Sequence, residues 1–164
     1  MSSAPPTAPD DARPFLLERF LPYRLSVLTN TVSRALSRQY AEPFDIGVLE
    51  WRVMAVVGRF EPTPAALVSE RTAMDKVAVS RAVANLLDKK LLTRRTDRDD
   101  RRRALLRLSR RGREMHDRIA GRAERLEESL LSVLDGRERR QLDRLLAKLA
   151  ARAAVLDEDD DPGR

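Results

Sequence analysis

Apolar stripes of helical period in the second half of the chain place the strongest constraint on its fold. No proline occurs between Pro64 and Pro162, so no residue there lacks the backbone N–H that a helix interior requires. Two long helices are therefore predicted, the first capped by Ser109 and the second opened by the capping-box pattern Asp135-Gly-Arg-Glu138. Apolar residues recur along both at steps of three and four, the period of one helix face. These residues are Met115, Ile119, Leu126, Leu130 and Leu134 in the first helix, and Leu142, Leu145, Leu146, Leu149, Ala153 and Leu156 in the second.

The N-terminal part of the chain predicts two further helices of the same period. One covers about residues 15–40, starts or is interrupted near Pro22, and is ended by Pro43. The next is stopped by Gly58, a residue suited to a left-handed helix end. Their apolar stripes are Leu21, Leu25, Leu28, Val32 and Leu36, and Ile46, Leu49, Val53, Val56 and Val57.

A helix-turn-helix pair is predicted in the middle of the chain. Thr63 is expected to cap a short helix with Pro64 at its first position, running to about Arg71. Asp75 is expected to cap the second helix after a tight connection at residues 72–74. The second helix would bury Val79, Val83, Leu86 and Leu87, and would turn Lys76, Val77, Ser80, Arg81, Ala84 and Asn85 outward.

The stretch RRTDRDDRRR, residues 94–103, is predicted to be the loop of a β-hairpin. Short alternating segments flank it at Leu91–Arg95 and Ala104–Leu108, which is typical of paired strands. An isolated charge run is as often a solvated loop, but a hairpin directly after a recognition helix can reach over phosphates into a minor groove. Three aspartates, Asp97, Asp99 and Asp100, can hold neighbouring arginines in place through exposed ion pairs.

Composition narrows the class of protein. The chain has 164 residues, a length that suits one domain. Its net charge is +6, with a basic stripe at residues 94–113. It has no cysteine, which excludes disulfides and thiolate metal sites. No apolar run is long enough to span a bilayer. Without a phosphate-binding glycine loop, a metal-spaced cluster or a nucleophile motif, neither an enzyme nor a cofactor is expected. Residues 1–14 are predicted to be a disordered leader and residues 157–164 an acidic tail, and a cytoplasmic location is expected, on the nucleoid when DNA is bound.

Two stretches carry a resemblance to a known family. AMDKVAVSRAVANLLDKKLLTRR followed by DRRRALLRLSRRG resembles the helix-turn-helix and wing of the MarR (multiple antibiotic resistance regulator) family, and the likeness covers residues 20–156. Its most specific part is the wing pattern, which here is Asp100, Arg102, Leu108, Ser109 and Gly112. The resemblance implies that Arg102 enters a minor groove, that Asp100 steadies it, and that Ser80 and Arg81 contact backbone and base edges. Two departures are Lys90, where relatives usually have the helix-ending glycine, and Ser109 in place of threonine.

The resemblance also implies the architecture: a mainly α fold with a small β-hairpin wing, in which a winged helix-turn-helix lobe is joined to long dimerisation helices. The expected single domain spans residues 15–156, with the lobe at 45–108 and the dimerisation helices at 15–40 and 109–156. A homodimer is also indicated by the residues themselves, because these helices carry more leucine than a small winged lobe could bury. The alternative is an intramolecular helical bundle.

The resemblance further implies the function: a sequence-specific regulator that binds palindromic double-stranded DNA, by default a repressor released by a small aromatic carboxylate or phenolic ligand. The predicted DNA-binding residues are Thr63, Asp75, Lys76, Val77, Ser80, Arg81, Asn85, Arg98, Arg101, Arg102 and Arg103, with Asp100 steadying the wing. The candidate ligand-binding residues are Arg24, Tyr40, Trp51 and His116, each of which could instead have an ordinary packing or surface role. Two rival functions are a sequence-nonspecific architectural nucleic-acid binder, which would use the basic stripe as a phosphate clamp, and a helical adaptor for another protein.

Overall fold

The computed structural model describes residues 15–97 and 104–159 as a mostly helical fold with one small antiparallel sheet. The elements are η1 (Leu17–Arg19), α1 (Leu21–Phe44), α2 (Val48–Phe60), β1 (Thr63–Pro64), α3 (Ala65–Thr72), α4 (Lys76–Asp88), β2 (Leu92–Thr96), β3 (Ala104–Leu108), α5 (Arg110–Leu131) and α6 (Gly136–Asp159). The predicted leader, residues 1–14, and the end of the acidic tail, residues 160–164, lie outside the described residues.

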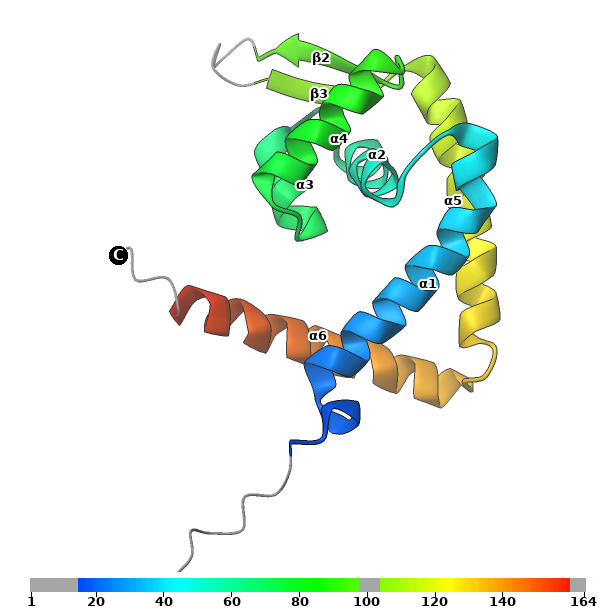
Figure 1. Ribbon diagram of the computed structural model, residues 1–164, viewed down its shortest axis with the longest axis vertical. Helices are drawn as coiled ribbons and strands as arrows, with labels where there is room; N and C mark the ends of the chain where they lie inside the picture. Colours follow the sequence, from blue (N-terminus) through cyan, green and yellow to red (C-terminus); the bar gives the residue numbers. More distant parts are fainter. Residues whose placement is uncertain (1–14, 98–103, 160–164) are drawn as a thin grey trace, which may run out of the picture.

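The molecule divides into a lobe and a set of long helices (Figure 1). The lobe contains α2, α3, α4 and the sheet, whose strand order is β1-β3-β2, so the lobe's hydrophobic core is closed by α2 packing on α3, α4 and β3. Helices α1 and α5 meet beside the lobe and diverge away from it, and α6 starts near the far end of α5 and makes only sparse contacts with the rest of the described chain. The core takes Tyr40 and Phe44 from α1 and Ile119 from α5, so both long helices are joined to the lobe.

Several local predictions are confirmed. Asp75 caps α4 by accepting the Ala78 N–H at 2.7 Å, and Ser109 caps α5 by accepting the Gly112 N–H at 2.9 Å. The capping box of α6 is present, since Asp135 and Glu138 each accept the other's backbone N–H. The hairpin strands start and end within one residue of the predicted positions.

The prediction that Pro43 ends the first helix is wrong, because α1 continues to Phe44 and closes with Asp45 in the left-handed conformation. A proline at position 43 cannot donate to the carbonyl of Gln39, one turn earlier. The guanidinium of Arg122, from α5, donates to that carbonyl instead. A neighbouring helix thus satisfies the group that proline leaves open.

The prediction that Gly58 stops the second helix is also wrong, since α2 runs on to Phe60. A Cβ at position 58 would lie 2.8 Å from His116 Nε2 and 3.1 Å from Leu108 Cδ1. Gly58 therefore serves the close packing of α2 against α5 and β3.

Thr63 does not cap α3. It lies in β1 opposite Leu106, so the sheet has a third strand that the sequence analysis did not predict, and Pro64 is the N-cap residue. The Thr63 side chain is 0% exposed, and its hydroxyl has no hydrogen-bond partner among the residues that the structure describes. Thr63 and Pro64 therefore form a strand, because they pair with β3 and Thr63 is not available to cap α3.

The end of α4 is joined directly to the start of α5. Lys90 takes the left-handed conformation with a φ of 57°, and its N–H and that of Leu91 bond back to Leu87 and Leu86, which is a Schellman ending. The carbonyl of Leu91 then accepts the Ser109 N–H at 2.9 Å. A Cβ on Gly112 would lie 1.9 Å from that same carbonyl oxygen, so only glycine fits there.

Gly112→Ala is expected to destabilise the protein by about 2 kcal/mol or more, because the new methyl group overlaps a backbone carbonyl that is fixed by hydrogen bonding. Gly121→Ala in the same helix is the matched control, since its Cβ would meet only Arg125 Nη1 at 3.7 Å. The control should gain roughly 0.5–1 kcal/mol from helix propensity. Urea unfolding followed by circular dichroism measures both, and equal effects of the two substitutions would contradict the steric argument.

Candidate nucleic-acid interface

The outward face of α4 is exposed and its polar side chains are free. Lys76, Ser80, Arg81 and Asn85 are all exposed, and within residues 15–97 and 104–159 their side chains make no hydrogen bond or ion pair. Val77 is 67% exposed between them. The opposite face buries Val79, Ala82, Val83 and Leu86, so the predicted inward and outward residues are confirmed, except that Leu87 is only half-buried. This face is available to a partner.

Asp75 differs from the other predicted contacts of α4. Its carboxylate already accepts the Ala78 N–H, so it helps to define where the helix begins. Among the predicted DNA-contacting residues that lie within residues 15–97, Thr63 is contradicted by the structure, because its side chain in β1 is completely buried. Asp75 therefore has a structural role at the start of α4, and Thr63 has one inside the lobe.

The hairpin formed by β2 and β3 places basic residues on both of its faces. Leu92 pairs with Leu108 and Arg94 with Leu106, and this inner face is turned toward α4. Thr93 and Arg95 alternate with them, opposite Arg107 and Leu105 on the outer face. The predicted tip residues Arg98, Asp99, Asp100, Arg101, Arg102 and Arg103 lie outside the described residues.

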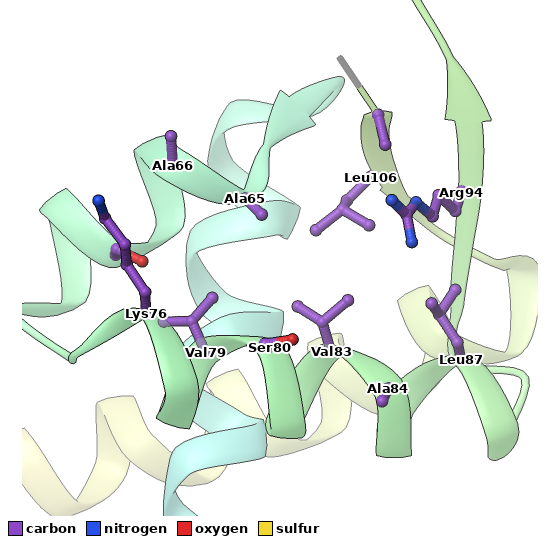
Figure 2. A pocket seen from close by; sticks show the side chains of 12 residues that line it. Ala65, Ala66, Lys76, Val79, Ser80, Val83, Ala84, Leu87, Arg94 and Leu106 are labelled. Carbon is purple, nitrogen blue, oxygen red and sulfur yellow. The ribbon is translucent and has the colours of Figure 1, made fainter. Parts of the chain in front are cut away.

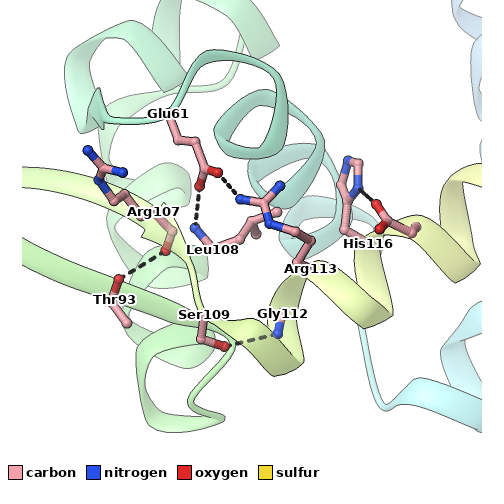
Figure 3. Close-up of polar contacts among 9 residues, drawn as sticks. Glu61, Thr93, Arg107, Leu108, Ser109, Gly112, Arg113 and His116 are labelled. Atoms are coloured by element: carbon pink, nitrogen blue, oxygen red, sulfur yellow. Dashed lines mark hydrogen bonds and ion pairs between the residues drawn. The ribbon is translucent and has the colours of Figure 1, made fainter.

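The base of the hairpin is held by Glu61 (Figure 3). Because β1 has only two residues, Leu108 on β3 has no strand partner on that side, and the Glu61 carboxylate accepts its N–H at 2.8 Å. The same carboxylate pairs with Arg113 from the first turns of α5. Glu61 therefore connects the end of α2 to both the wing and α5.

A cavity of about 390 Å³ lies between α3, α4 and the inner face of the hairpin. Its walls are mainly apolar, and the guanidinium of Arg94 and the ammonium of Lys76 enter from opposite ends, with Ser80 between them (Figure 2). Its apolar lining residues are Ala65, Ala66, Val79, Val83, Ala84, Leu87, Ala104 and Leu106. The sequence did not predict this cavity, because residues of four separate elements, α3, α4, β2 and β3, form it and none of them carries a signal for it alone.

A model of the MarR family matches residues 44–103, which include α2, α3, α4 and β2. A MarR/EmrR family transcriptional regulator from Acinetobacter sp. ADP1 has a similar structure, with 28% sequence identity and a TM-score of 0.79. The alignment covers 85% of this chain and 99% of that chain. The resemblance to the MarR family is confirmed.

Two other solved structures share the MarR-type fold. The MepR–DNA complex of S. aureus is 20% identical over 83% of this chain and 98% of that chain, with a TM-score of 0.74. BpsR of Bordetella bronchiseptica, whose DNA binding is regulated by 6-hydroxynicotinic acid, is 21% identical over 84% of this chain and 97% of that chain, also with a TM-score of 0.74. No curated protein matches the chain.

Three of the four candidate ligand residues meet where α1, α2 and α5 of the MarR-type fold converge. The rings of Tyr40 and Trp51 are 6.1 Å apart, and those of Trp51 and His116 are 5.6 Å apart. Tyr40 is buried, which raises the pKa of its phenol above the ordinary value, against a smaller lowering by Arg52. Arg24 is exposed on α1 roughly 24 Å away along the helix, so it does not join them.

Among residues 15–97 and 104–159, no three His, Asp or Glu side chains cluster closely enough to hold a metal ion. No helix in the same ranges is both long and apolar enough to cross a membrane.

Proposed function

We propose that this protein is a sequence-specific, dimeric DNA-binding transcriptional regulator. The observation that carries the proposal is the free outward face of α4, where Ser80, Arg81 and Asn85 are exposed and uncommitted while the helix itself is fixed by its caps and core. Amide and guanidinium groups in this arrangement can read base edges from the major groove. Arg102 in the neighbouring wing would add a minor-groove contact, with Asp100 beside it and Arg98, Arg101 and Arg103 on phosphates.

Dimerisation is proposed because the long helices leave much apolar surface uncovered. On α1 the exposed apolar residues include Leu21, Tyr23, Leu25, Val27 and Leu28, and on α6 they include Leu145, Leu146, Leu149, Val155 and Leu156. Contiguous exposed apolar surface of this kind usually marks an interface. An intramolecular bundle would have covered it, yet α6 packs only sparsely on the rest of the described chain. We assign residues 15–40 and 109–156 to this interface.

Light scattering is expected to give twice the 18.6 kDa mass of the chain. Leu149→Asp should shift the protein toward monomer by placing a charge in the apolar interface, whereas Gln141→Asp, on an exposed polar position of α6, should leave the dimer intact. A parent protein with monomer mass at every concentration would end the dimer proposal.

The sequence readout is tested by Arg81→Ala. We expect operator binding to weaken by about 1–3 kcal/mol, with little change on scrambled duplexes, because a base contact supplies discrimination whereas a phosphate contact does not. Arg110→Ala is the control, since that exposed side chain is paired with Glu114 on α5. Fluorescence anisotropy in about 0.15 M salt measures both duplexes. If the parent binds every duplex equally and with steep salt dependence, the protein is a nonspecific nucleic-acid binder instead.

We further propose that a small aromatic carboxylate releases the protein from DNA. Repression is the default mode of regulation in this proposal. The cavity beside α4 supports this, because its apolar walls suit a ring and Arg94 suits a carboxylate. The ligand would bind more tightly to a conformation in which the separation of the two recognition helices does not match successive major grooves. The affinity for DNA would then fall by as much as the ligand prefers this conformation over the DNA-binding one. The Tyr40, Trp51 and His116 group is the second candidate location.

Calorimetry with a panel of aromatic carboxylates tests the effector. We expect Arg94→Met to weaken binding about tenfold or more, because it removes the cation that faces the cavity. Arg95→Met is the matched control, since its side chain lies on the other face of β2. The absence of heat from any of the panel at millimolar concentration would remove the effector proposal, and unchanged binding by Arg94→Met would move the ligand away from this cavity.

A further inference from the structure

One ammonium group lies where three helix ends meet. Lys89 is the C-cap residue of α4, and its Nζ donates to the backbone carbonyl of Asp45, the C-cap residue of α1. The same nitrogen is 3.4 Å from the Asp45 carboxylate and 3.3 Å from the carboxylate of Glu50, in the first turn of α2. Lys89 and Asp45 are 44 positions apart in the sequence, so the contact joins two distant parts of the chain.

The burial of Glu50 makes this contact more costly to break than an ordinary surface ion pair. Glu50 is only 8% exposed, and its Oε2 also accepts the Gly47 N–H at 2.7 Å. A carboxylate with so little water around it needs a cation, and Lys89 is the one that pairs with it among the described residues. The last carbonyls of α1 also carry partial negative charge and lack helical donors, which Lys89 supplies at Asp45.

Lys89 completes the attachment of α4 to the long helices. On one side, Leu91 and Ser109 lock the exit of α4 to the start of α5. On the other side, Lys89 is the polar link from the same helix end to the end of α1. Helices α2 and α3 pack on the body of α4, and its C-terminal end is in addition attached to α5 and α1, the helices assigned above to the dimer interface.

We propose that Lys89 is the positioning residue that sets the angle of α4 against α1, and through it the separation of the two α4 helices in the dimer. This inference rests on the proposed function. A dimeric helix-turn-helix protein binds half-sites about one helical turn apart, near 34–36 Å, so a small tilt at this joint changes which spacing fits. Loosening the joint should therefore relax spacing selectivity more than it weakens contact with any single half-site.

The variants separate positioning from simple stabilisation. Lys89→Met removes the cation but leaves Glu50 buried and unpaired, so part of its effect would be lost stability. The double variant Lys89→Met/Glu50→Gln removes both charges, and the glutamine can still accept the Gly47 N–H; its unfolding temperature should recover toward that of the parent. Lys89→Arg keeps a cation, and Lys90→Met is the matched control, because the Lys90 side chain has no hydrogen bond or ion pair within the described ranges.

The first readout needs no DNA. The chain has no cysteine, so a single Val77→Cys on the exposed face of α4 can carry a spin label, and pulsed dipolar spectroscopy gives the distance between the two labels of a dimer. We expect a narrow distribution for the parent, Lys89→Arg and Lys90→Met. We expect a clearly broader one for Lys89→Met and for the double variant.

The second readout uses unlabelled protein on two operators, one natural and one with a base pair added between the half-sites. The parent should bind the lengthened operator about tenfold or more weakly, whereas the double variant should show a loss of about threefold or less. A double variant that keeps both the narrow distance and the parent's spacing selectivity would overturn the proposal, as would a monomeric parent. If the parent prefers no duplex, the proposed function fails, and the label distances still decide whether Lys89 sets the position of α4.

Discussion

The contact between Gly112 and the carbonyl of Leu91 is the constraint on which the rest of the structure depends. Lys90 reverses the chain at the end of α4, and the Leu91 carbonyl then accepts the Ser109 N–H while Gly112 packs directly on it. Because a hydrogen bond holds Leu91 next to Ser109, the chain between them must reverse its direction and come back to the end of α4. That geometry produces the hairpin beside α4 and starts α5 at the base of the lobe.

The cations of this protein serve two distinct purposes. Lys89, Arg113 and Arg122 each bind a carboxylate or an open backbone carbonyl, and in doing so they join helices that are far apart in the sequence. Lys76 and Arg81 make no such contact within the described residues and lie on the exposed face of α4. A strongly basic composition therefore overstates the charge available to a polyanion, because some of the cations are used to join helices.

Much of the fold could be predicted because its signals are local. The caps at Asp75 and Ser109, the capping box at Asp135 and, apart from Leu87, the inward face of α4 were predicted correctly, because each depends on residues close together in the sequence. The errors at Pro43, Gly58 and Thr63 share a different cause. In each case a distant element decided the outcome: Arg122 of α5 accommodated the proline, His116 required the glycine, and β3 paired with the threonine.

The sequence by itself determined the helical periods, the hairpin, the residues on the outward face of α4 and the likeness to the MarR family, because each is written in spacings of a few residues. Only the tertiary structure decided that Thr63 is buried, that Arg94 faces a cavity while Arg95 faces away, and that Lys89 joins the ends of three helices. These features depend on which elements pack together in the folded chain. The spacing of apolar residues within one element does not identify the element that it will contact.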